Sequence, residues 1–191
     1  MENNDKIRMN ILVRGIVQGV GFRPFIHRLI TEHSLNGWVR NSSSGAQMEV
    51  EGREEEVLSF IRDLTEKKPR LVLIEDIQAE KMDRTAGYTD FRIIPSNREN
   101  ERNTLISPDV CTCPDCVREL FDPRDRRYRY PFINCTNCGP RFTIIKDIPY
   151  DRDKTTMASF PMCADCYNEY TDITNRRYHA QPDCCEKCGP R

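Results

Sequence analysis

Eight of the ten cysteines in this chain form a four-cysteine unit that occurs twice. Its members are the pairs Cys113 and Cys116, Cys135 and Cys138, and then, fifty residues later, Cys163 and Cys166, Cys185 and Cys188. A Cys-x-x-Cys turn directs two thiolates toward one point, and two such turns complete the closed tetrahedron that a structural zinc ion prefers. The spacing therefore predicts two structural zinc ions, each held by four cysteines.

The residues around the cysteines repeat with the same offset, which indicates a duplication. Counterparts fifty residues apart include Glu119 and Glu169, Asp122 and Asp172, the Arg-Arg-Tyr runs 126–128 and 176–178, and the Gly-Pro-Arg runs 139–141 and 189–191. A duplicated unit should carry its own ligands, so we expect pairing within each repeat, although interleaved pairing stays open. Cys111 and Cys184 fall outside the register and are expected to be spare thiols. We expect His179 to be a surface or packing residue.

Three other uses of the cysteines are less favoured. The chain opens without a basic segment followed by an apolar run, so nothing directs it to an oxidising compartment where four disulfides would form. Redox Cys-x-x-Cys motifs seldom occur in a duplicated register. Four thiolates leave no open position for water, which argues against catalytic zinc. Since no stretch of 18 apolar residues exists either, we expect a soluble cytoplasmic protein.

A second kind of chemistry is indicated near the start of the chain. Residues 7–13 alternate between apolar and polar as a half-buried strand does, and apolar residues from Phe22 to Ile30 recur at helix spacing. Between them runs a loop with three glycines, followed by Arg23 and Pro24. A helix start offers unpaired N–H groups to an anion, glycines let the backbone approach a phosphate, and Arg23 can add a charged clamp. A simple turn is the other interpretation of this loop.

The rest of the first half continues a recognisable order. Residues 37–51 predict a hairpin, Val57, Ile61 and Leu64 lie on one face of a second helix, and residues 71–79 and 91–94 supply later strands. The order βαββαβ predicts an α+β fold, a ferredoxin-like sandwich with helices on one face of an antiparallel sheet.

Cysteine placement divides the chain into a part built on an apolar core and a part built on metal. All ten cysteines lie at or after residue 111. The region from there to residue 191 has few apolar residues for a core, so we expect it to need zinc to fold. We predict a first domain over residues 5–95, a polar linker over 96–107, and zinc fingers over 108–141 and 142–191. The formal net charge of −1 excludes a polyelectrolyte.

The Arg-Arg pairs at residues 126–127 and 176–177 have two interpretations. They could form a basic patch beside aromatics that stacks on nucleic-acid bases. A turn that is solvated or faces the zinc thiolates is favoured, because two all-thiolate zinc centres would make the fingers acidic overall. We therefore do not expect a nucleic acid as partner.

The two motifs of the first domain resemble those of acylphosphatases. Gly15–Arg23 and Gly37–Asn41 match the family pattern, and the resemblance covers roughly residues 5–95. It implies that Arg23 and a phosphate-binding loop hold the phosphoryl group while the catalytic amide of Asn41 orients the attacking water. The loop residues are Gln18, Gly19, Val20, Gly21 and Phe22.

Taken together, the domain and the fingers resemble the amino-terminal part of the HypF family, carbamoyltransferases of nickel–iron hydrogenase maturation. The runs Tyr130–Arg141 and Arg177–Pro182 carry this resemblance beside the cysteines. It implies carbamoyl phosphate as substrate, ATP as co-substrate and a HypE-like acceptor protein. That family continues past the second finger, whereas this sequence stops at Arg191, so we expect a fragment that retains hydrolysis but lacks the transfer step. A free-standing acylphosphatase with a zinc-stabilised tail is the alternative enzyme.

Overall fold

The computed structural model describes residues 6–96 and 105–191 of the chain. These residues form two compact units, one comprising the described residues of 1–18 and 22–105 and the other comprising Gly19–Gly21 and Ile106–Arg191. Most of the predicted linker, residues 97–104, lies outside the described part. The predicted domain boundaries stay predictions.

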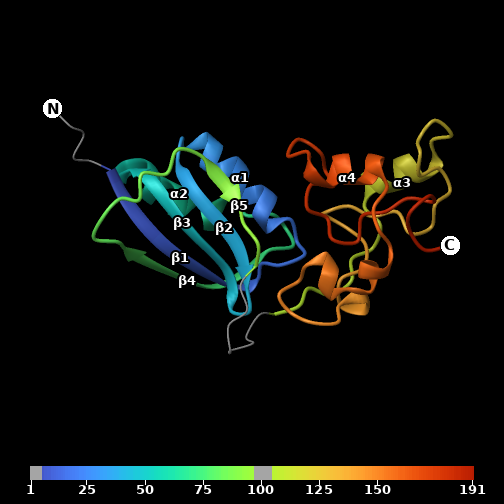
Figure 1. Cartoon of the computed structure of the whole chain (residues 1–191), viewed down its shortest axis with the longest axis horizontal. Coiled ribbons are helices and arrows are strands. Elements are labelled where there is room, and N and C mark those ends of the chain that lie inside the picture. Colours follow the sequence, from blue (N-terminus) through green and yellow to red (C-terminus); the bar gives the residue numbers. More distant parts are fainter. Residues whose placement is uncertain (1–5, 97–104) are drawn as a thin grey trace. The chain divides into compact units, whose positions relative to one another are not determined.

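The first unit contains a five-stranded sheet in the order β4-β1-β3-β2-β5 (Figure 1). The strands are β1 (Lys6–Ile16), β2 (Asn36–Ser42), β3 (Gly45–Arg53), β4 (Leu73–Lys81) and β5 (Phe91–Ile93). The predicted α+β sandwich is confirmed, but the expectation of a wholly antiparallel sheet is wrong. β5 pairs parallel to β2, because the connection after β4 crosses to the opposite edge of the sheet.

The connection from β4 to β5 is held across the sheet by side chains. The Glu51 carboxylate accepts hydrogen bonds from the backbone N–H groups of Ala86 and Gly87. The Tyr88 hydroxyl donates to Glu49 at 2.6 Å and accepts from the indole of Trp38 at 3.1 Å. These bonds place β5 beside β2.

The core of the first unit consists of the buried alternate residues of the strands and the apolar faces of two helices. Ile7, Met9, Ile11 and Val13 of β1 are buried while the residues between them are partly exposed. Helices α1 (Phe22–Glu32) and α2 (Glu54–Glu66) contact each other and the sheet (Figure 1). Phe60, which the sequence pattern did not single out, is fully buried on α2, whereas Ile61 is only half-buried.

The second unit has little regular structure and little apolar core. Its helices are α3 (Pro114–Phe121) and α4 (Ala164–Thr171), which lie fifty residues apart, and short 3-10 turns η1 (Phe142–Ile144), η2 (Arg152–Lys154) and η3 (Thr156–Ser159). One buried cluster consists of three cysteines and a single isoleucine, Ile133. Sulfur therefore occupies the positions that apolar side chains fill in an ordinary core. None of the helices in the described ranges has the length and hydropathy needed to cross a membrane.

Candidate anion site and metal centres

The glycine loop between β1 and α1 has the backbone geometry that an anion cradle requires. Gly19 and Gly21 have φ values of 71° and 75°, a region that side-chain-bearing residues rarely adopt. Val20 and Phe22 between and after them are each 1% exposed, so apolar side chains anchor the loop while its glycines turn the backbone. Helix α1 follows with no acidic residue in its first turn, which keeps its N-terminus favourable for an anion.

The Gln18 side chain fixes this loop to the turn between β2 and β3. Its amide nitrogen donates to the carbonyl oxygens of Ser42 at 2.7 Å and Gly45 at 2.8 Å, and all of these bonds are buried. Ser42 is the residue directly after Asn41, so the fold brings the loop to the end of β2 where Asn41 lies. The sequence pattern places Gln18 in the loop but gives no sign of this role for its side chain.

Arg23 and Asn41 are polar residues held in the interior of the first unit. Arg23 is 9% exposed at the second position of α1, and Asn41 is 1% exposed on β2, where it pairs with Ala46 of β3. Burial of both side chains, together with the strand pairing that fixes the Asn41 backbone, limits the conformations that each polar group can adopt. Their catalytic roles, and the phosphate contacts of the loop, stay predictions.

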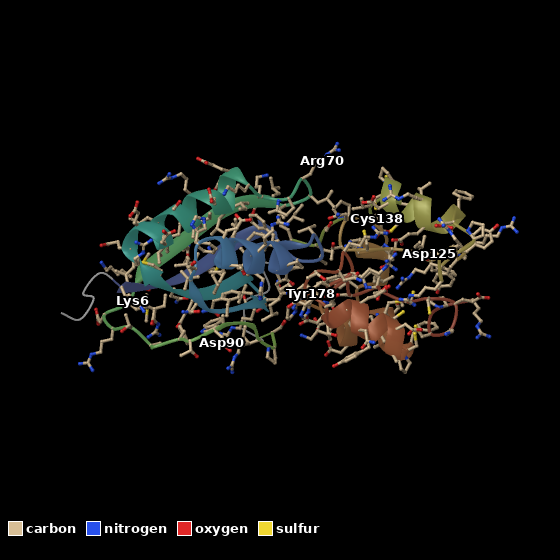
Figure 2. All side chains as sticks on the ribbon, turned by 90° about the horizontal axis from the view of Figure 1, so that it is seen from above. Lys6, Arg70, Asp90, Asp125, Cys138 and Tyr178 are labelled. Carbon is tan, nitrogen blue, oxygen red and sulfur yellow. The ribbon has the colours of Figure 1, made fainter. Side chains whose placement is uncertain are left out.

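The structure gathers the eight repeated cysteines into two separate groups of four. Cys113, Cys116, Cys135 and Cys138 form one, called here the first cluster, and Cys163, Cys166, Cys185 and Cys188 form the second cluster. Each set comes from one repeat, which agrees with the expected pairing within repeats and not with interleaved pairing. Cys138, labelled in Figure 2, is fully buried.

Distances within the clusters fit a metal ion better than disulfides. Neighbouring sulfur atoms lie 3.4–3.8 Å apart in the first cluster and 3.6–3.9 Å apart in the second. Four sulfurs each about 2.3 Å from a central zinc would lie about 3.8 Å from one another. A disulfide requires about 2.05 Å, and all ten cysteines are free thiols. Both clusters therefore have the ligand type, number and spacing of a closed tetrahedral metal site.

Local structure explains why each Cys-x-x-Cys turn can present two thiolates together. Cys113 is the N-cap of α3 and Cys163 is the N-cap of α4, while Cys116 and Cys166 follow in the first helical turn. The helix N-terminus, which carries partial positive charge, thus lies beside two of the sulfur atoms of each cluster.

The Arg-Arg pairs face the clusters instead of forming a basic patch. Arg127 is 1% exposed and Arg177 is 3% exposed, and both pair with carboxylates inside the second unit. Burial alone would raise the pKa of Glu119, but hydrogen bonds from Arg176 and Arg177 outweigh it and lower this pKa to about 2. The arginine side chains that could have formed a basic patch are therefore engaged inside the second unit.

The residues outside the repeat register lie outside the clusters. Cys111 is exposed, whereas Cys184 is buried with its sulfur 3.4 Å from the Tyr130 hydroxyl. His179 packs its ring against Tyr170 and Tyr178, which agrees with a packing role.

One charged residue of this region was missed by sequence reasoning. Asp183 is fully buried and lies 2.8 Å from Arg127 Nη2 and 3.6 Å from Arg177 Nε. Its counterpart in the first repeat is Ile133, so the duplication gave no signal for it.

Comparison with known protein families assigns both parts of the chain. The acylphosphatase family model matches residues 9–93, and the HypF finger model matches residues 112–145 and 162–191. An acylphosphatase of Bacillus pumilus is 38% identical over 88 residues, which cover 46% of this chain and 97% of that protein.

Longer relatives match both parts at once. A probable carbamoyltransferase HypF of Methanocaldococcus jannaschii is 47% identical over 149 residues, which cover 78% of this chain and 20% of that protein. A crystal structure of full-length HypF in a phosphate- and nucleotide-bound form superposes with a TM-score of 0.93 at 52% identity, covering 97% of this chain and 24% of that one. The chain thus spans about a fifth to a quarter of the length of these relatives.

Proposed function

Because the chain belongs to the acylphosphatase family through residues 9–93 and to the HypF family through its domain and fingers together, we propose that it binds and hydrolyses carbamoyl phosphate. The observation that carries this proposal is the glycine loop, whose backbone turns at Gly19 and Gly21 just before the N-terminus of α1. A loop of this kind offers backbone N–H groups to a phosphoryl group.

The reaction asks for little covalent chemistry from the protein. Carbamoyl phosphate already carries a good leaving group, so water attacks phosphorus while the bond to the carbamoyl oxygen breaks, giving inorganic phosphate and carbamate. Arg23 and the loop N–H groups balance the charge on the phosphoryl oxygens, and the Asn41 amide places the water. No nucleophilic side chain is needed in this scheme, since positioning and charge stabilisation supply the catalysis.

The carbamoyl preference and the acceptor come from the relatives. Proteins named carbamoyltransferase HypF are 45–50% identical to this chain over 149–160 residues. We propose that the carbamoyl group made available here is destined, with ATP, for a HypE-like acceptor protein. The transfer itself is assigned to parts of those relatives that this chain does not match.

Both clusters are proposed to bind zinc, one ion each, as structural centres. All-cysteine coordination with no open position suits zinc, which has no redox chemistry and accepts a closed tetrahedron. The ions would hold residues 108–191 folded so that this region serves as a structural and docking module. We place the protein in the cytoplasm, where reduced thiols remain available for metal.

A free-standing acylphosphatase is the second candidate, because the chain covers 97% of a curated acylphosphatase at 38% identity. The two candidates differ in acyl-group preference. Zinc-loaded protein should release phosphate from carbamoyl phosphate with a higher kcat/KM than from acetyl phosphate. Equal or reversed preference would favour the free-standing enzyme, and no release from either substrate would overturn both.

The role given to Asn41 has its own test. Asn41→Ala should lower kcat by about 100-fold with little change in KM, because water is misplaced while phosphate binding persists. An unchanged kcat would show that this amide does not position the nucleophile.

A further inference from the structure

We propose that the two cysteine clusters form one cooperative metal-binding unit, in which each repeat supplies the arginine that stabilises the other repeat's thiolates. The inference rests on the proposed metal binding and goes beyond it, because two independent fingers would require no such exchange. Its evidence is a set of contacts that cross between the repeats in both directions.

Arg176, from the second repeat, reaches the first cluster. Its Nη2 donates to Cys116 Sγ at 2.9 Å, and its Nη1 lies 3.7 Å from Cys113 Sγ. The same guanidinium donates to both carboxylate oxygens of Glu119, at 3.0 and 2.9 Å. A first-repeat thiolate and a first-repeat carboxylate thus share one second-repeat arginine.

Arg126, from the first repeat, makes the reciprocal contacts. Its Nη1 and Nη2 donate to Cys166 Sγ of the second cluster at 3.3 and 3.4 Å. It also pairs with Glu169, the counterpart of Glu119. Since Arg126 and Arg176 are themselves counterparts fifty residues apart, the exchange follows the symmetry of the duplication.

The neighbouring arginines join the repeats through their buried centre. Arg127 Nε donates to the Cys184 carbonyl at 2.9 Å, and Arg177 Nε donates to the Asn134 carbonyl, the counterpart position, at 3.1 Å. Both guanidinium groups also meet the fully buried carboxylate of Asp183. The two halves therefore share one charge network without a boundary between them.

The position of each arginine along the chain couples metal binding at one cluster to metal binding at the other. Arg126 and Arg127 lie in the segment between the first and second Cys-x-x-Cys turns of their own cluster, so metal in the first cluster closes the loop that carries them. The same holds for Arg176 and Arg177 in the second repeat. Closing a loop removes conformational entropy that would otherwise oppose ordering of the arginine. Metal in either cluster thus orders the donor that the other cluster needs, and the effect must be reciprocal.

The negative charge of a metal–thiolate centre makes the arginine N–H donors important. Four thiolates around a divalent ion leave about two negative charges in a partly buried place, where N–H donors from arginine count for more than they would in water. Loss of metal from one cluster releases its arginine segment and leaves the other cluster with uncompensated charge.

The first test uses the unaltered chain. Zinc-loaded protein is titrated with a chelator, and the species with two, one and no ions are counted by native mass spectrometry. We expect the one-ion species to stay below its statistical share, because the second ion should bind about tenfold more tightly than the first. A one-ion species at its statistical abundance would overturn the proposal, whereas a chain that takes up no metal would overturn the proposed zinc function instead.

The second test asks which cluster each arginine supports. In Arg176→Ala and Arg126→Ala, thiols freed by limiting chelator are alkylated and mapped by peptide mass spectrometry. We expect Arg176→Ala to expose the first cluster's cysteines and Arg126→Ala to expose those of the second, each at chelator concentrations about tenfold lower than in the unaltered chain. Exposure of the variant's own repeat first, or no change, would contradict the exchange.

A matched control and a milder variant complete the test. Arg124→Ala removes an arginine two positions from Arg126 whose side chain is 90% exposed and, among residues 6–96 and 105–191, pairs with the nearby Asp122. Arg124→Ala should leave unchanged the chelator concentration at which the cysteines of each cluster become exposed. If an alanine variant fails to load two ions, Arg176→Lys or Arg126→Lys takes its place, because lysine keeps the charge but loses the bidentate contact of the guanidinium. The lysine variant should likewise release metal first from the cluster of the opposite repeat.

Discussion

At the residue level, the Gln18 side chain holds the glycine loop against the turn between β2 and β3. Its amide satisfies two buried carbonyl groups on the turn that follows Asn41, so the loop and the end of β2 are held together. Because unsatisfied buried carbonyls are costly, this single residue links the stability of the fold to the geometry of the anion site.

We predict that Gln18→Ala lowers the free energy of unfolding by about 2 kcal/mol and lowers kcat/KM together with it. Urea unfolding followed by fluorescence of Trp38, the only tryptophan, reports on the first unit. Gln78→Ala is the control, since Gln78 is exposed on β4 and its side chain donates to the neighbouring, exposed Asp76. Equal stability of the two variants would refute the role given to the Gln18 amide.

At the scale of elements, the two helices of the first unit are joined by charge beside the core. Asp63 on α2 accepts from Lys67 at 2.7 Å and from the His33 ring, beyond the end of α1, at 2.8 Å. Hydrogen bonds from Lys67 and then His33 hold the pKa of Asp63 below its usual value. A depressed carboxyl pKa stabilises the fold above the unfolded-state pKa and ceases to do so as the pH falls through the folded-state value.

Asp63→Asn should therefore destabilise the first unit at pH 7, and the difference from the unaltered chain should shrink as the pH falls below about 4. Trp38 fluorescence during urea unfolding at pH 7 and pH 3 measures both free energies. A difference that stays constant between these pH values would show that the carboxylate charge contributes nothing.

Local sequence patterns predicted most elements but not the contacts between distant ones. Alternation gave β1, and helix spacing gave α1 and α2, because burial on one face leaves a period in the sequence. The parallel pairing of β5 with β2 left no such trace, since the side chains that hold the connection lie 35 and 39 positions earlier in the sequence. Asp183 was invisible for a related reason, because its role depends on two arginines brought in by the fold.

In the candidate sites, too, local features were predictable from the sequence and long-range contacts were not. Ligand type and spacing predicted the four-cysteine clusters, because both cysteine pairs of a cluster are local turns. Spacing did not predict that Arg126 and Arg176 reach the opposite repeat, since each arginine lies nine and ten residues from the two nearest cluster cysteines of its own repeat and at least 37 residues from those of the other. Duplication reveals which residues correspond but not which copy they serve.

On the scale of the whole molecule, the two units are stabilised by different means. The first has an apolar core without cysteine, whereas the second places sulfur where a core would be. We predict that chelation removes amide hydrogen-exchange protection from α3 and α4 while β1 and β3 stay protected. Protected α3 and α4 after complete metal removal would show that the second unit folds without metal.

We propose that the glycine loop and Arg23 form a hydrolytic phosphate site, and a pair of arginine variants tests this. Phosphate release from carbamoyl phosphate is compared between zinc-loaded Arg23→Ala and Arg28→Ala, because Arg28 lies on the same helix with its side chain 66% exposed. We expect Arg23→Ala to lose about 100- to 1,000-fold in kcat/KM while Arg28→Ala retains full activity. Equal rates for the two variants would contradict it.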